Sequence, residues 1–130
     1  MNAVHSFLAV AVLALAGCNS VASGNDNRHD VVADGSTFAM RPGQSVTLAD
    51  HGVLRYERLV NDSRCMPDVQ CIWAGDAELA FEWRAGSGPA EHFSLHTGNG
   101  AKSHALGERT LTLVTVARGP APEAQLRIEL

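Results

Sequence analysis

Lysine is nearly absent from this sequence, with Lys102 as the single occurrence in 130 residues. Lysine and arginine together number 10 against 14 acidic residues, which gives a formal net charge of −4. The basic residues are scattered along the chain and form no run. The clustered positive charge that nucleic-acid binding requires is therefore missing, and no nucleic-acid partner is expected.

A long hydrophobic run is missing as well. Phe7–Ala16 is a stretch of ten residues without charged or strongly polar side chains, about half of what a membrane-spanning helix needs. This length is typical of the apolar region of a signal peptide. The run ends in Leu15-Ala16-Gly17-Cys18, in which small residues lead into the cysteine, and this has the form of a lipobox. The sequence therefore predicts a lipoprotein signal peptide at 1–17 and a lipidated Cys18 as the first mature residue.

The residue after Cys18 bears on the destination of such a lipoprotein. In bacterial lipoproteins, Asp at that position tends to retain the protein at the inner membrane, whereas this chain has Asn19. The resemblance implies an outer-membrane lipoprotein that faces the periplasm, with the membrane as a partner through the lipid anchor. The polar, aperiodic stretch at 18–35 is expected to be the lipidated cysteine with a flexible tether.

A helical stripe of apolar residues is also lacking, and from residue 36 onward the apolar period is two. We therefore predict an all-β domain at 36–130, a single antiparallel β-sandwich or small barrel of about seven strands. The Pro42-Gly43-Gln44 turn is expected to join the first two strands, and a bulge is expected between Leu113 and Val114. The last two runs are expected to pair as a hairpin. The predicted strands cover 38–40, 46–48, 53–60, 76–84, 91–96, 109–117 and 125–130, with a loop at 97–107.

Cysteine is scarce, with three residues in the chain. If Cys18 carries the lipid, Cys65 and Cys71 form an even pair in a compartment where disulfides persist, and a disulfide between them is predicted. The alternative is a soft-metal site in which Met66 is a third ligand beside two thiolates, although no further cysteine or nearby histidine completes it.

The block around these cysteines is the densest local pattern in the domain. One interpretation, which the sequence favours, is a stapled corner in which Trp73 packs beside the disulfide and fills the core. The other is a loop presented to a partner on a rigid, disulfide-closed base. The residues that such a loop would display are Met66, Pro67, Asp68 and Gln70.

This block resembles an uncharacterised family of small bacterial secreted proteins and lipoproteins. The shared pattern is an Asp-Ser-Arg-Cys stretch, a second cysteine and a closing Trp-Ala-Gly, and here it covers Asp62 to Gly75. Within it, Asp62, Arg64, Trp73 and Gly75 are the positions expected to be structural. The family pattern has Pro directly after the first cysteine, whereas here Pro67 follows Met66. The resemblance implies an exported β-domain and supplies neither a reaction nor a ligand.

No pattern for catalysis, a cofactor or a metal emerges from the remaining polar residues. His92 and His96 share one face of a predicted strand, but about 13 Å separates such positions, too far for one ion. Glu78 and Glu82 are equally far apart, beyond the usual spacing of glycosidase carboxylates. We therefore expect solvated strand faces, and the protein is not expected to be an enzyme.

The sequence thus predicts a lipid-anchored cell-envelope protein with a non-catalytic role, binding or supporting an envelope protein partner. Two alternatives remain at this point. One is an inhibitor of a secreted hydrolase that uses the Cys65–Cys71 loop, and the other is a periplasmic metal-binding protein.

Overall fold

The computed structural model describes residues 30–130 and contains nine β-strands and no helix in that range. The predicted signal peptide, Cys18 and most of the predicted tether lie outside the described residues. No helix in the described part of the chain is long and apolar enough to cross a bilayer. The strands are β1 (Val31–Val32), β2 (Thr37–Met40), β3 (Ser45–Leu48), β4 (Val53–Asp62), β5 (Ala77–Arg84), β6 (Ala90–His96), β7 (Ser103–Leu106), β8 (Arg109–Val116) and β9 (Ala124–Glu129).

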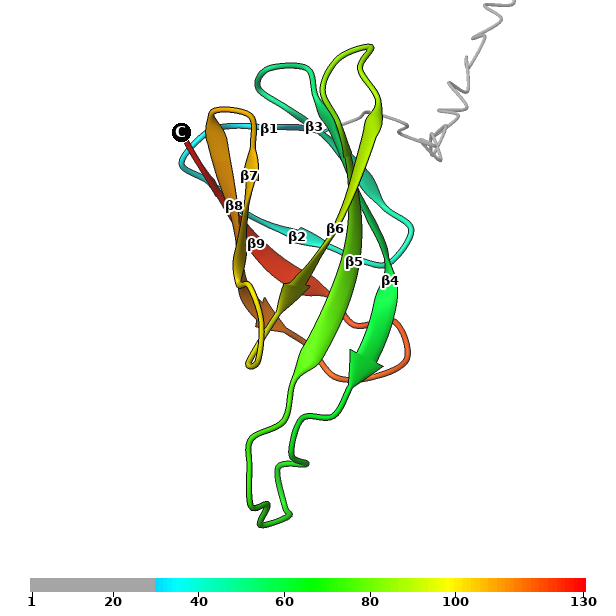
Figure 1. Cartoon of the computed structure of the whole chain (residues 1–130), viewed down its shortest axis with the longest axis vertical. Helices are drawn as coiled ribbons and strands as arrows, with labels where there is room; N and C mark the ends of the chain where they lie inside the picture. The colour runs from blue at the N-terminus through cyan, green and yellow to red at the C-terminus, as the bar shows by residue number, and fades with distance from the viewer. Residues whose placement is uncertain (1–29) are drawn as a thin grey trace, which may run out of the picture.

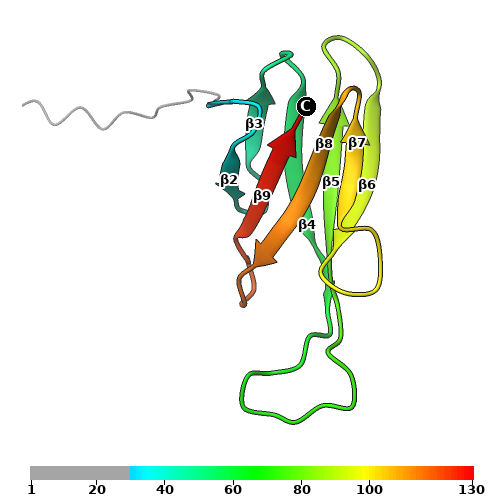
Figure 2. The ribbon, with the colours of Figure 1, turned by 90° about the vertical axis from the view of Figure 1, so that its left-hand side faces the viewer.

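The strands form two sheets that pack face to face, which confirms the predicted β-sandwich class (Figures 1 and 2). One sheet has the order β1-β3-β4-β5-β6 and the other β2-β9-β8-β7. Alternation of apolar and polar residues turns one side of each strand toward the partner sheet. The fully buried large side chains include Tyr56, Phe81, Leu95, Leu111 and Ile128, and they form one core between the sheets.

The first strand is a correction to the sequence interpretation. Val31 and Val32 lie within the stretch predicted to be a flexible tether, yet they pair in parallel with Thr47 and Leu48 of β3. Val32 is buried in the core, and Asp34 makes an ion pair with Arg109. Two apolar residues are too few for a period to be visible, so the polar composition around them hid the strand.

The C-terminal hairpin was predicted correctly. Strands β8 and β9 pair in antiparallel register, and their register shifts between Leu113 and Thr115, where the bulge was expected. The N-terminal pair was predicted wrongly. The Arg41–Gln44 turn does form, with the Gln44 amide donating to the Arg41 carbonyl at 3.0 Å, but β2 pairs with β9 and β3 with β4. The turn therefore carries the chain from one sheet to the other.

Strand β7 is a further correction, because Ser103–Leu106 lies inside the predicted loop at 97–107. It pairs with β8 at the edge of its sheet. Leu106 is its one fully buried residue, which is too weak an apolar pattern to distinguish an edge strand from a loop.

The segment between β4 and β5 projects beyond both sheets at one end of the sandwich (Figures 1 and 2). It contains both cysteines of the predicted loop. Strand β1, where the described chain begins, lies at the opposite end (Figure 1). The fold therefore presents residues 63–76 far from the N-terminal entry of the domain.

Candidate functional site

The projecting loop has a hydrogen-bonded base that continues the β4–β5 hairpin. The Ser63 amide donates to the Asp76 carbonyl at 2.7 Å, and the Cys65 amide donates to the Ala74 carbonyl at 2.9 Å. Beyond these bonds, Cys65 and Cys71 form a disulfide, as the sequence predicted. The bridge uses both thiols, so the alternative of a soft-metal site with Met66 is wrong for this oxidised form.

Asp62 and Arg64 attach the base of the loop to the other sheet. The Arg64 guanidinium donates to both oxygens of Asp62, at 2.8 and 2.6 Å. It also donates to the carbonyls of Val116 and Ala117, at 2.7 and 2.8 Å. The hydrogen bonds from Arg64 hold the pKa of the Asp62 carboxyl below its usual value, and the same pairing raises the pKa of Arg64. The prediction of structural roles for these residues is consistent with this geometry.

Asp76 closes the other side of the base. Partial burial acts to raise the pKa of its carboxyl, but hydrogen bonds from His96 and the Gly98 amide outweigh this effect and lower the pKa. One oxygen lies 2.6 Å from His96 Nδ1 and the other accepts from the Gly98 amide at 2.7 Å. The Asp62 and Asp76 contacts together tie both ends of the loop to neighbouring strands and turns.

Gly75 is required by the geometry of the base. Its φ is +72°, and a Cβ at this position would collide with the Ser63 carbonyl. Since the Ser63–Asp76 bond lies at that point, a larger residue would push the two sides of the base apart.

Trp73 contradicts the core interpretation. Its exposed fraction is 81%, and Ile72 beside it is fully exposed. The loop projects beyond the sheets, and Trp73 is not among the residues of the core cluster. The stapled corner with a buried tryptophan is wrong, because Trp73 lies on the surface.

Four apolar side chains are exposed on this loop, and we name them the apolar tip: Met66, Val69, Ile72 and Trp73. A hollow of about 460 Å³ lies among the apolar tip, the disulfide and Arg64. Its volume falls in the range of pockets that bind a small ligand or an inserted side chain. The loop thus offers apolar surface together with a concave surface on a constrained backbone.

The other residues predicted for a displayed loop, Pro67, Asp68 and Gln70, are exposed in the same segment. The sequence analysis named Met66 among the displayed residues but missed the exposure of Val69, Ile72 and Trp73. The pattern that could have revealed them is four large apolar residues within a segment that lacks any strand period.

The histidines and acidic residues on β5 and β6 were predicted to lie on solvated strand faces. The two histidines have different partners, but the side chain of His96 is only 21% exposed, so the solvated interpretation is wrong for His96. His96 contacts Asp76, whereas His92 lies near Glu57. The sequence interpretation missed one cross-strand pair. Glu82 on β5 and His92 on β6 lie directly opposite each other. This combination becomes visible only when the strand register is known.

Comparison with known proteins gives no relative: no protein-family model, curated protein or solved structure matches this chain. The resemblance of the cysteine block to small bacterial secreted proteins therefore stays a prediction.

Proposed function

We propose that this protein is a non-catalytic binding module of the bacterial cell envelope that presents the apolar tip to a protein partner. The observation that supports this most strongly is the exposure of Trp73 and Ile72 on a disulfide-closed loop. Exposed apolar clusters on monomeric domains are typical of interaction sites. Trp and Met are also enriched at protein interfaces, and Trp is a frequent binding hot spot.

The restraints on the loop backbone favour tight binding in a fixed conformation over binding that requires the loop to change its conformation. The disulfide, the Ser63–Asp76 bond and the Asp62–Arg64 pair restrain the backbone before any partner arrives. Restraint of this kind lowers the ordering entropy that association costs. The apolar tip is therefore suited to enter a groove on a folded protein.

A protein partner is favoured over the membrane by the placement of the loop. In our proposal the chain is anchored at Cys18, and its described part enters the domain through β1. That strand lies at the end of the sandwich opposite the apolar tip (Figure 1). The tip would then point away from the membrane that holds the lipid.

Site-specific photo-crosslinking in intact cells tests this proposal. A photoreactive amino acid at Ile72 is expected to give one dominant protein adduct, and Trp73→Ser is expected to abolish it. A photoreactive residue at Val114, which is exposed on β8, is the matched control and is expected to give no such adduct. Adducts of equal yield from both positions, or crosslinks to lipid alone from Ile72, would overturn the proposal.

A narrower form of the same proposal is inhibition of a secreted hydrolase. A protruding, disulfide-closed loop is a suitable shape for an active-site cleft. If the captured partner is a hydrolase, the purified domain should inhibit it, and Trp73→Ser should remove the inhibition.

A further inference from the structure

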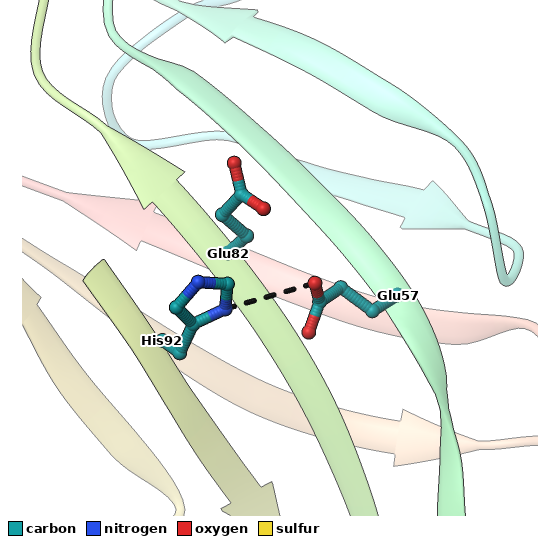
Figure 3. Close-up of side chains that lie close together, drawn as sticks. All are labelled: Glu57, Glu82 and His92. Carbon is teal, nitrogen blue, oxygen red and sulfur yellow. Dashed lines mark ion pairs between the residues drawn. The ribbon is translucent and has the colours of Figure 1, made fainter. Parts of the chain in front are cut away.

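Three potential metal ligands meet on the outward face of the five-stranded sheet. Glu57 lies on β4, Glu82 on β5 and His92 on β6, and one ligand atom from each lies within 4.8 Å of the others. His92 Nδ1 is 3.6 Å from a carboxylate oxygen of Glu57. Figure 3 shows His92 and Glu57 directed toward each other across β5, with Glu82 beside them on that strand.

The strand register explains how these residues come together. Glu82 and His92 are direct partners in the β5–β6 pair, so their side chains stand side by side on one face. In the β4–β5 pair the register jumps from Tyr56↔Phe81 to Arg58↔Ala80, which leaves Glu57 as the extra residue of a bulge. A bulge re-aims the side chain that it carries, and this one brings Glu57 to the pair.

The surroundings leave room for an ion. A hollow of about 360 Å³ lies over the sheet beside the cluster, bordered by Glu57 and His92 but not by Glu82. The Glu57 and Glu82 side chains are about one-third exposed, at 31% and 29%. Arg84 is 3.7 Å from Glu82, and an ion pair between such partly exposed groups is weak enough for a divalent cation to replace it.

The chemistry of the donor set selects the class of cation. Imidazole nitrogen suits zinc, copper, nickel and iron, whereas calcium and magnesium prefer oxygen ligands alone. One nitrogen and two carboxylate oxygens can supply three of the four ligands of a tetrahedral zinc ion, and water can occupy the remaining position. A tetrahedral zinc ion with bonds of about 2.0–2.1 Å places its ligand atoms about 3.3 Å apart. Side-chain rotation of Glu57, Glu82 and His92 can reach that spacing.

We propose that Glu57, Glu82 and His92 form a binding site for a divalent transition-metal cation of the zinc class. The site shares no residue with the apolar tip, so it does not depend on the function proposed above. It also requires no thiol, since Cys65 and Cys71 are joined.

Calorimetric titration of the oxidised protein with Zn²⁺ tests this site. We expect one zinc ion per chain, with affinity reduced by about tenfold or more in His92→Gln and in Glu82→Gln. The matched control is His104→Gln, because His104 also contacts a glutamate, Glu91, at 2.6 Å but has no third ligand in the described part of the chain. This variant is expected to bind zinc like the parent protein.

Thermal unfolding without metal would show that the variants are folded. The proposal is overturned if zinc does not bind stoichiometrically, or if His104→Gln loses as much affinity as His92→Gln. It is also overturned if equimolar Ca²⁺ displaces the zinc, because that would indicate a carboxylate cluster without a role for the imidazole.

Discussion

At the residue scale, the Asp62–Arg64 pair makes the stability of the protein depend on pH in the acidic range. The pKa of Asp62 is below its usual value because Arg64 donates hydrogen bonds to the carboxylate. A lowered folded-state pKa adds stability above the unfolded value of about 3.9, and this stability is lost as the pH falls through the folded-state value. Asp62→Asn is therefore expected to lower the free energy of unfolding by about 1–2 kcal/mol at pH 7.

Urea unfolding at pH 7 and at pH 2 checks this expectation. The difference between Asp62→Asn and the parent protein should shrink as the pH falls from 7 to 2, because a lowered folded-state pKa costs the parent protein stability once the pH is below the unfolded value. Asp68→Asn, which alters an exposed carboxylate elsewhere on the loop, serves as the control. A difference that stays constant between the two pH values would contradict the explanation.

Gly75 is a second single residue on which the stability of the loop base depends. Gly75→Ala is expected to destabilise the loop base by more than the 1–3 kcal/mol or so that a left-handed conformation alone costs, because its Cβ meets the Ser63 backbone. Hydrogen exchange of the Ser63 amide measures the effect directly. Gly86→Ala is the control, since Gly86 also has positive φ but open space around its Cβ position. Equal effects of the two substitutions would show that the close approach is unimportant.

At the scale of elements, Tyr56 joins the two sheets. Its hydroxyl donates to the Pro122 carbonyl at 3.1 Å, which links β4 to the turn between β8 and β9. Burial raises the pKa of Tyr56 to about 12. A raised pKa contributes stability that is complete below the unfolded value of about 10 and is lost as the pH rises toward 12.

Two measurements check the role of Tyr56, which is the single tyrosine of the chain. Absorbance of the tyrosinate should titrate near pH 12 in the folded protein. Tyr56→Phe should lose about 0.5–1.5 kcal/mol at pH 7 and show a smaller further loss between pH 9 and pH 11 than the parent protein. Tyrosinate formation near pH 10 in the folded state would refute the burial of the Tyr56 hydroxyl.

The elements also show what the sequence could predict. Residues with a long alternating pattern, such as Leu79, Phe81 and Trp83 on β5, were assigned to the core correctly. Where two or three apolar residues stand alone, as in Val31–Val32 or around Leu106, the local pattern carried too little information. The separation of β2 from β3 could not be foreseen either, because a turn specifies its own conformation and not the partner of each flanking strand.

The candidate sites were predictable to different degrees. The Cys65–Cys71 disulfide followed from the number of cysteines and from the predicted export of the chain. The exposure of Trp73 could not be predicted in this way, because a large apolar side chain is usually buried. Only the structure shows that the loop carries Trp73 away from the core. The Glu57–Glu82–His92 cluster depends on a bulge and on the pairing of three strands, which no local sequence pattern encodes.

At the scale of the whole molecule, the domain boundary has a direct test. A chain that begins at Ser36 follows the boundary expected from composition, whereas one that begins at Asp30 retains β1. The shorter chain loses the burial of Val32 and the ion pair between Asp34 and Arg109. We expect it to be less stable by about 2 kcal/mol or more in urea unfolding, since burial of one valine contributes about 1.5–3 kcal/mol. Equal stability of the two chains would place the boundary at Ser36.

The Ser63–Asp76 backbone hydrogen bond also marks the point where the loop leaves the packed sandwich. Sequence beyond this bond contributes nothing to the core, and the entropy of closing a loop rises only slowly with its length. The segment between Cys65 and Cys71 can therefore be exchanged or lengthened at little cost to folding, because Arg64 and Gly75 of the loop base lie outside it. The domain is thus a natural scaffold for displaying foreign peptides, with the existing β4–β5 hairpin as the grafting point.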